Sequence, residues 1–552
     1  MSKKNYKKGI LVVVGTLAII GAGGTYLWTR TIIGKELTPT EAASMVPEKA
    51  WMATYISTNS KSWSKLTEFG SYKAKDLLHE ELDDLSSQLS DNNINYHKDI
   101  KPWLGSMMIA KFPPNEGKSM TNPESLNLLA VIGIKNKLEA GMFIEKLKGV
   151  INPSYFLKRT YKGVLILETK TKTNELLNTA LIEDRLIMAS NPRTMNLAID
   201  TIQGEPSFAD KIEPQKIITK NLGQERTLIQ IYIPDFVSVM KTSLRSSPQT
   251  RLATRTVEKI NDIEAIMMEV AVNERGLHFQ TIAKLNSSAN RPEIRGLSDE
   301  LLPHLPDSTI ALIKAGSIKR SWSSFLATAA KDRILKFNLN KYKNSFESKM
   351  EVDLERDVFS WMDGEFALAI IPTNRGILAD YGLAGRAMWT TTQRSQAEKA
   401  LKKLEEKVEY FGEVLVKKRV LNGKEITEWI TFQGEDILSY SWLNDSCLML
   451  TFGNPPDSNI DINFNNSLSK DQSFTTVTSY LPKNNKGYFY LNNLDIIIPI
   501  IERLFEKTSY SIIPEARAAL TSVESIALTT SNPLPFFSQL DIMVSLKSEE
   551  RN

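Results

Sequence analysis

The sequence contains very few of the residues that build metal and redox sites. Its 552 residues include one cysteine, Cys447, so no internal disulfide can form and the fold must rely on apolar cores. The 42% of hydrophobic residues are enough for that. His79-Glu80-Glu81 lacks the second histidine of a zinc-binding helix. The four histidines are isolated from one another in the sequence: His79, His97, His278 and His304. We predict no metal site.

Motifs for nucleotides and common cofactors are also missing. There is no G-x-x-x-x-G-K-[ST] loop, no G-x-G-x-x-G after a strand and no G-x-S-x-G elbow. We therefore predict no cofactor and assign no catalytic, cofactor-binding or metal-ligating residue.

Long uncharged runs are rare, and only Gly9 to Trp28 could cross a membrane. Its 28 − 9 + 1 = 20 residues span about 30 Å, the thickness of a hydrocarbon core. By the positive-inside rule, basic residues before the span predict a cytoplasmic N-terminus and an external bulk. These basic residues are Lys3, Lys4, Lys7 and Lys8. A cleaved signal peptide, cut near Ala22 and Gly24, is the alternative.

The exported part has no excess of charge of either sign. Without the four lysines of the tail, 68 − 4 = 64 basic residues face 64 acidic ones. No basic block remains that would indicate nucleic-acid binding. Short tracts such as Lys146-Leu147-Lys148 and Lys402-Lys403 are interpreted as solvated helix faces.

What the sequence does contain is one unit written twice. Ser62-Trp63-Ser64 recurs as Ser321-Trp322-Ser323, at 321 − 62 = 259 positions, and Trp103-Leu104-Gly105 recurs as Trp361 to Gly364. Other pairs keep nearly the same spacing: Val46 and Leu305, Pro113 and Pro372, Gly163 and Gly423, Asp184 and Asp445, Glu264 and Glu524. The predicted organisation is a cytoplasmic tail (1–8), a transmembrane helix (9–28), a tether (29–45), a first copy (46–285), a linker (286–304) and a second copy (305–547).

Both copies show the same order of expected elements. A strand (51–58; 309–315) leads to the helix with Ser-Trp-Ser, and an amphipathic helix follows, at 74–89 in the first copy. Two strands (107–112 and 126–134; 366–371 and 383–390) and a helix (137–150; 395–408) come next. Two-residue hairpins are expected at 162–163 and 422–423, and at 183–184 and 444–445. A strand, a helix and an apolar strand pair (263–285; 523–546) close each copy. This pattern predicts an α+β fold with an antiparallel sheet.

One constellation has the spacing of a serine acyl-transferase of the penicillin-recognising kind. Ser62 to Lys65 fits S-x-x-K, Ser90-Asp91-Asn92 spells S-D-N, and Lys241-Thr242-Ser243 approaches K-T-G. That chemistry needs a lysine beside the serine hydroxyl and a strand carrying K-T-G. Lys241 instead falls in an expected helix, and Ser324 replaces the lysine in the second copy. We therefore expect no enzyme, with this activity as an alternative.

One further residue and two further pairs are assigned structural roles. Cys447 aligns with Leu186, which predicts a buried, unreactive thiol. Trp63 and Trp322 could form a ligand platform, but the expectation is core packing with the indole nitrogen on a nearby carbonyl. Glu264 and Glu524 are expected to face solvent.

Four segments together resemble a known family. They are Leu37-Thr38-Pro39-Thr40-Glu41-Ala42-Ala43, Val46-Pro47, residues 52–58 (MATYIST) and residues 62–66 (SWSKL). In these the chain resembles the cyanobacterial membrane-anchored proteins that carry the domain of unknown function 3352. The resemblance implies a photosynthetic bacterium and an anchored, exported domain. It implies no activity and no functional residues.

The sequence thus predicts a single-pass membrane protein with its bulk in the periplasm or thylakoid lumen. Its expected role is a non-enzymatic binding or assembly (scaffold) component, held by membrane lipid through the anchor. An unknown protein or ligand is expected at the junction of the two repeats. The alternatives are an envelope serine hydrolase or acyl-transferase, and a carrier of an apolar ligand. A broad exposed apolar patch would favour the scaffold, a polar cleft the enzyme and a dry cavity the carrier.

Overall fold

The computed structural model describes the chain from residue 36 to residue 547 with gaps. The described ranges are 36–69, 94–113, 127–148, 156–170, 176–211, 227–245, 261–286, 296–330, 333–410, 412, 414–453, 466–505 and 514–547. The predicted membrane span (9–28) and the amphipathic helix predicted at 74–89 lie outside these ranges. Within them, no helix is long and apolar enough to span a bilayer.

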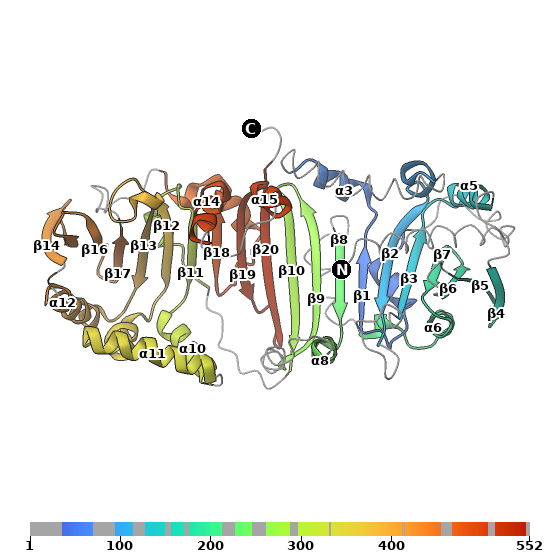
Figure 1. The fold of residues 1–552 in the computed structure, drawn as a ribbon, viewed down its shortest axis with the longest axis horizontal. Helices are drawn as coiled ribbons and strands as arrows, with labels where there is room; N and C mark the ends of the chain where they lie inside the picture. The colour runs from blue at the N-terminus through green and yellow to red at the C-terminus, as the bar shows by residue number, and fades with distance from the viewer. Residues whose placement is uncertain are drawn as a thin grey trace. The chain divides into compact units, whose positions relative to one another are not determined.

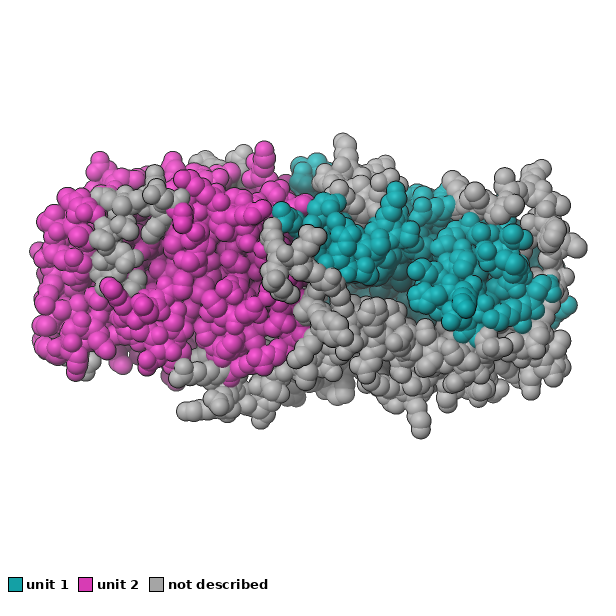
Figure 2. Space-filling view, turned by 90° about the horizontal axis from the view of Figure 1, so that it is seen from above, with its two compact units in different colours: residues 1–291, 533–539, 548–552 teal, residues 292–532, 540–547 magenta. Residues whose placement is uncertain are grey.

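The chain divides into two compact units. The first comprises Met1–Arg291, Pro533–Gln539 and Ser548–Asn552, and the second Pro292–Asn532 and Leu540–Lys547 (Figure 2).

The first unit contains an antiparallel sheet of ten strands in the order β4-β5-β6-β7-β3-β2-β1-β8-β9-β10. The antiparallel α+β prediction is confirmed. The strands are β1 (Met52–Ile56), β2 (Leu104–Lys111), β3 (Leu128–Ile134), β4 (Phe156–Tyr161), β5 (Val164–Lys170), β6 (Leu176–Ile182), β7 (Arg185–Ala189), β8 (Thr227–Ile233), β9 (Ile263–Asn273) and β10 (Gly276–Leu285).

Apolar clusters cover both faces of this sheet. The larger cluster packs α2 (Pro39–Ser44), α6 (Pro192–Ile202) and the 3-10 turn η6 (Phe208–Lys211) on one face. On the other face, the π-helical turn η3 (Tyr96–Ile100) and α5 (Lys137–Lys148) contribute Ile100 and Phe143 to a second cluster. Two more helices are α3 (Ser60–Thr67) and α8 (Phe236–Arg245). Because both faces of these strands are covered, they are nearly continuously apolar, as in β7.

The predicted tether proves to belong partly to the core of the first unit. Thr38 caps α2: its hydroxyl accepts from the Glu41 N–H at 3.3 Å, while the Glu41 carboxylate accepts from the Thr38 N–H at 3.2 Å. This reciprocal pair is a capping box, with Pro39 at the first helical position. Ala42 and Ala43 are then fully buried, so the tether prediction is wrong for this segment.

The second unit contains ten strands in the corresponding order, β14-β15-β16-β17-β13-β12-β11-β18-β19-β20. The strands are β11 (Ala311–Ala315), β12 (Phe366–Pro372), β13 (Leu383–Thr390), β14 (Val414–Leu421), β15 (Lys424–Thr431), β16 (Asp436–Trp442), β17 (Cys447–Phe452), β18 (Gly487–Asn492), β19 (Val523–Ser531) and β20 (Phe537–Leu546), of which residues from Leu540 onward belong to this unit.

The helices of the second unit also pack on both faces of its sheet. One face carries the short 3-10 turns η8 (Leu302–His304) and η12 (Leu468–Lys470) with α13 (Gln472–Ser479). The other carries α10 (Ile318–Ala329), the π-helical turn η9 (Leu354–Val358), the 3-10 turn η10 (Phe359–Trp361) and α12 (Arg394–Tyr410). Further helices are α11 (Arg333–Met350), α14 (Leu494–Phe505), α15 (Pro514–Thr521) and the short η11 (Ala379–Tyr381). Figure 1 shows α10, α11 and α12 near one end of the strands.

The predicted linker also contributes to a core. Leu301 and Leu302, inside the range 286–304, are buried in the main cluster of the second unit together with Leu305. Most of the predicted linker, residues 287–295, lies outside the described residues, but Leu301 and Leu302 belong to the second unit.

Three of the four predicted hairpins have the expected two-residue turn. Lys162-Gly163 and Asn422-Gly423 both take left-handed φ values, as a type I′ turn requires, and Glu183 does the same in the third. The two-residue turn predicted at Asn444-Asp445 is wrong. A loop from Leu443 to Ser446 joins β16 to β17, and the Asn444 side chain accepts from the Ser446 and Cys447 N–H groups.

Candidate functional site

The serine constellation does not form an acyl-transferase site among the described residues. Ser62 is buried in α3, while Lys65 binds the carboxylates of Glu274 at 2.8 Å and Glu68 at 2.9 Å. These contacts, with Glu274 first, raise the pKa of Lys65, which opposes its use as a neutral base. Lys241 lies in α8, as predicted, and not on a strand. Ser90-Asp91-Asn92 lies outside the described residues.

The paired tryptophans are less buried than predicted. Trp63 is 38% exposed, although its indole nitrogen donates to the Ser57 carbonyl at 2.6 Å as expected. Trp322 is half-buried, with its ring 4.6 Å from the ring of Phe359 and 5.7 Å from that of Phe325. Core packing is therefore wrong for Trp63, because the bond to Ser57 fixes the indole at the end of β1, where one face stays open.

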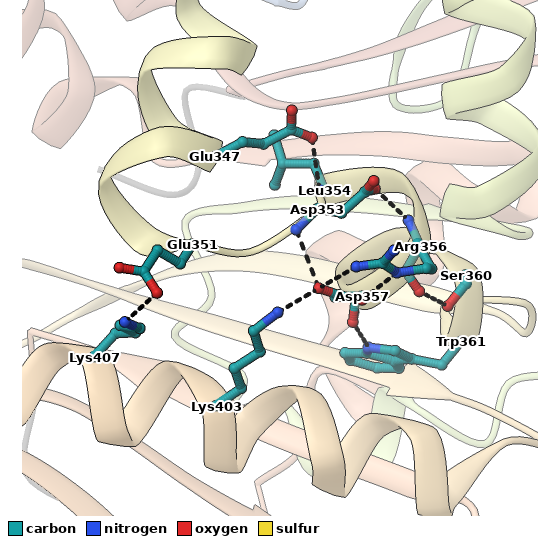
Figure 3. A network of polar contacts seen from close by, with 10 residues as sticks. All are labelled: Glu347, Glu351, Asp353, Leu354, Arg356, Asp357, Ser360, Trp361, Lys403 and Lys407. Carbon is teal, nitrogen blue, oxygen red and sulfur yellow. Dashed lines mark hydrogen bonds and ion pairs between the residues drawn. The ribbon is translucent and has the colours of Figure 1, made fainter.

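A polar network surrounds the π-helical turn η9 of the second unit (Figure 3). The Asp353 side chain accepts from the Arg356 N–H at 2.8 Å, and the Asp357 carboxylate accepts from the Asp353 N–H at 3.1 Å. This is a capping box with one extra residue between its partners, since a π-turn is wider than an α-turn. Lys403 of α12 donates to Asp357 at 2.8 Å, and the Trp361 indole donates to the Asp357 carbonyl at 3.2 Å.

The first unit has the same network at the corresponding positions. The Asn95 side chain accepts from the Lys98 N–H at 3.0 Å, and Asp99 accepts from the Asn95 N–H at 2.7 Å. Lys146 of α5 donates to Asp99 at 2.6 Å, and the Trp103 indole donates to the Asp99 carbonyl at 2.8 Å. Lys146 and Lys403 remain 38% and 39% exposed, in keeping with the predicted solvated helix faces, but each also binds a carboxylate of a π-helical turn.

These networks hold helices onto the sheet. Trp103 and Trp361 are almost fully buried in the clusters beneath α5 and α12. The guanidinium of Arg356, and then the ammonium of Lys403, hold the pKa of Asp357 well below its usual range. A permanently charged carboxylate bonded on all sides has no proton to exchange near neutral pH, so the network is structural. Aligning Asn95, Asp99 and Trp103 with their partners in the second copy would have revealed it from the sequence.

The first unit also buries a carboxylic acid inside its sheet. Glu269 of β9 is 2% exposed, and it accepts hydrogen bonds from Thr227 and, at 3.3 Å, from Gln230. Gln280 lies opposite it on β10, and buried His278 acts on it electrostatically. Burial raises the pKa of Glu269. The closing strand pair, predicted as apolar, is thus polar on this stretch of its inner face.

The second unit buries a lysine inside its sheet. Lys314 of β11 is 1% exposed, and its ammonium lies 3.4 Å from a Glu365 carboxylate oxygen and 5.7 Å from the centre of the Tyr488 ring. Among the described residues, no three His, Cys, Asp or Glu side chains lie close enough together to bind a metal ion.

The single cysteine is buried as predicted. Cys447 lies in the main cluster of the second unit, and burial raises the pKa of its thiol to about 11. The strand register corrects its alignment by one residue. Leu448 pairs with Trp389 as Leu186 pairs with Ile132, and Trp389 and Ile132 pair in turn with Phe366 and Met107, so Cys447 corresponds to Arg185 and not to Leu186. The longer loop before β17 accounts for the shift.

The paired glutamates differ from each other. Glu264 faces solvent as expected and binds Lys284 at 3.2 Å. Glu524 is half-buried and accepts from Ser473 at 3.2 Å and Ser545 at 2.9 Å, so the solvent prediction is wrong for it.

A patch of apolar side chains is exposed on the second unit's sheet. Ile313 and Leu368 are register partners on β11 and β12, with 45% and 36% exposure. Ile370, also on β12, is 42% exposed, and Phe452 on β17 is 38% exposed. Both are in register with Gly385 of β13, which lies between them in the sheet. These four side chains are here called the outer apolar patch. They share the sheet face that carries α10 and α12 but extend beyond the cluster that those helices cover.

The corresponding face of the first unit is less apolar. Its register pairs Thr54 with Ile109 where the second unit pairs Ile313 with Leu368, and Lys111 stands where the second unit has Ile370. Two apolar side chains of the patch are therefore specific to the second unit. Contiguous apolar side chains exposed on the surface of a folded domain commonly mark a surface that binds a partner.

Comparisons with known proteins give a family but no activity. The family described as "Protein of unknown function (DUF3352)" matches residues 10–546, which confirms the predicted family. No curated protein matches the chain. Among solved structures, crystal form III of TP0453 is 11% identical over 45% of this chain and 82% of its own, with a TM-score of 0.26. Crystal form I is 10% identical over 45% and 81%, with a TM-score of 0.25. Similarity this low supports no argument about fold or function.

Proposed function

The chain belongs to the family of proteins of unknown function DUF3352, and from this premise we propose that it is a membrane-anchored binding or assembly protein without catalytic activity. Residues 9–28 would form the anchor, and the rest of the chain would act outside the cytoplasm. The family's expected origin in photosynthetic bacteria would place it in the periplasm or the thylakoid lumen.

The outer apolar patch is the observation that carries this proposal. Ile313, Leu368 and Ile370 lie on neighbouring strands and present their side chains to solvent. Each of these side chains is 36–45% exposed, so a partner that covered the exposed remainder would gain about 1 kcal/mol per side chain. A flat sheet face of this kind suits a protein partner better than a small substrate, which needs a concave site.

We also propose that the two units arose by duplication of one domain and then diverged in role. The same strand order and the same Asp-Lys-Trp network in each support it. The divergence at the patch, from Thr54 and Lys111 to Ile313 and Ile370, supports a binding role for the second unit.

The proposal is tested by replacing two residues of the outer apolar patch with those at the corresponding positions of the first unit. Ile313→Thr with Ile370→Lys gives the second unit the residues that the first unit carries at these positions, so folding should be retained. A photo-reactive amino acid at Leu368, in full-length protein in its native membrane, should crosslink a partner, and the double substitution should abolish that product. Phe432→Ser, at an exposed position in the turn after β15, serves as the control and should leave crosslinking unchanged. Unchanged crosslinking in the double variant would refute the proposal.

A further inference from the structure

Helix α11 carries two of the most exposed aromatic side chains of the second unit. Phe337 is 69% exposed and Tyr342 is 72% exposed. Both belong to an 18-residue helix that contacts α10 and α12 and lies near one end of the strands (Figure 1). The half-buried positions, such as Leu339 and Met350, form the inner side of the helix, so the two aromatic rings lie on the side that faces away.

The same outward side is basic. At 100° per residue, Lys341 and Lys349 fall on the arc between Phe337 and Tyr342, and both are exposed. Helix α11 contains five basic residues, Arg333, Lys336, Lys341, Lys343 and Lys349, against the single acid Glu347. Lys343, which is half-buried, forms ion pairs with Glu347 and Glu355, and within the described part of the chain Lys341 and Lys349 form none.

We infer that the outward side of α11 docks onto the surface of an anionic membrane. Two properties are combined there. Moving the aromatic rings out of water lowers their free energy, and bringing the lysines close to negative charge lowers theirs. An anionic lipid surface satisfies both at the depth where acyl chains meet headgroups. An amphipathic helix lying flat in that interface uses this combination, and each lysine near an anionic surface strengthens binding about fivefold. A protein partner would more often meet such rings with a groove of its own.

This inference is independent of the outer apolar patch and of the anchor. The patch comes from strands β11, β12 and β17, whereas the docking side comes from α11 alone. The anchor would hold the protein on any bilayer, whereas the charge of α11 selects anionic lipid.

The single buried cysteine permits a direct test. Tyr342→Cys in the full chain can be labelled with an environment-sensitive fluorophore, because Cys447 is buried in the folded protein. Vesicles of phosphatidylcholine with phosphatidylglycerol should shift the label's emission to the blue, and vesicles of phosphatidylcholine alone should not. The same label at Phe432→Cys, 63% exposed on another element of the same unit, should not respond to either.

Charge removal supplies the second arm. Lys341→Gln with Lys349→Gln should weaken the response to anionic vesicles about thirtyfold, or about fivefold for each lysine. Flotation of the protein with neutral vesicles reports the anchor separately, so loss of flotation would count against the anchor alone. An unresponsive Tyr342→Cys label on floated anionic vesicles overturns the inference, and so does a response equal to that of Phe432→Cys. A double-stranded DNA fragment that shifts the label where vesicles do not would also overturn it, in favour of nucleic acid.

Discussion

Replacing Asp357 by alanine should destabilise the second unit, because its carboxylate joins two elements of that unit, η9 and α12. The substitution removes the acceptor for the Asp353 N–H at 3.1 Å and for the Lys403 ammonium at 2.8 Å. It also removes the ion pair with Arg356, whose side chain is largely exposed.

The magnitude follows from the three contacts taken separately. Losing a helix cap costs about 1 kcal/mol. Losing the half-exposed Lys403 pair costs about 1 kcal/mol, and the exposed Arg356 pair adds a few tenths at most. The sum is about 2 kcal/mol, which lowers the melting temperature of a unit of this size by roughly 4–8 °C. Asp357→Asn keeps an acceptor for the Asp353 N–H and should cost about half as much.

The pH dependence has a definite sign. Since the folded state lowers the pKa of Asp357, its contribution is fully present above the unfolded pKa of about 3.9 and is lost as pH falls through the folded value. The stability difference between the wild type and Asp357→Asn should therefore be constant at neutral pH and shrink below about pH 4.

Calorimetry of the full chain measures the loss, and hydrogen exchange of α12 assigns it to the second unit. Arg356→Ala is the matched control and should change stability by less than about 0.5 kcal/mol. Asp99→Ala should reproduce the effect in the first unit, because Asn95 and Lys146 contact it in the same way. If Asp357→Ala unfolds at the wild-type temperature, the network does not hold α12 to the sheet and our reasoning is wrong.

Three further predictions test the other assignments. Native protein should resist a thiol reagent at Cys447 and react only after unfolding; rapid labelling of the folded chain would show an accessible thiol. A β-lactam probe should leave Ser62 unmodified, and a covalently labelled peptide containing it would restore the acyl-transferase alternative. Gly105→Ala should cost about 2 kcal/mol or more, because a Cβ there would lie 2.6 Å from the Gly133 carbonyl oxygen. Gly141→Ala, in open space on α5, should instead gain about 0.5–1 kcal/mol, and equal effects of the two would contradict the close approach.

Local sequence signals predicted most of the strands and turns. Asn422-Gly423 and Lys162-Gly163 require left-handed backbone at both turn positions, so the two-residue hairpins follow from composition alone. At Asn444 the same reasoning failed, because its side chain bonds to two N–H groups beyond it and widens the loop. An Asx residue can start either kind of turn, and only the strand register distinguishes them.

Contacts between segments that are distant in the sequence were harder to predict. The capping box at Thr38 and Glu41 is written in the sequence as S/T-x-x-E, yet its position between a hydrophobic run and the first copy favoured a tether. The wider box at Asn95 and Asp99 has no standard spacing, because the π-turn adds a residue. The partner lysine, Lys146, lies 47 residues further along the chain and could be found only through the repeat.

Comparing the two units position by position separates folding from function better than either unit does alone. The Asp-Lys-Trp network occurs in both, which is expected of contacts that any copy of the fold needs to hold a helix on its sheet. The apolar residues Ile313 and Ile370 occur in one unit only, where the other has Thr54 and Lys111 on the same strand face. A contact needed for folding would persist in both copies, whereas a surface that binds a partner is free to be lost from the copy that does not use it. The difference at these two positions, and not the shared core, is therefore where a role for this protein should be sought.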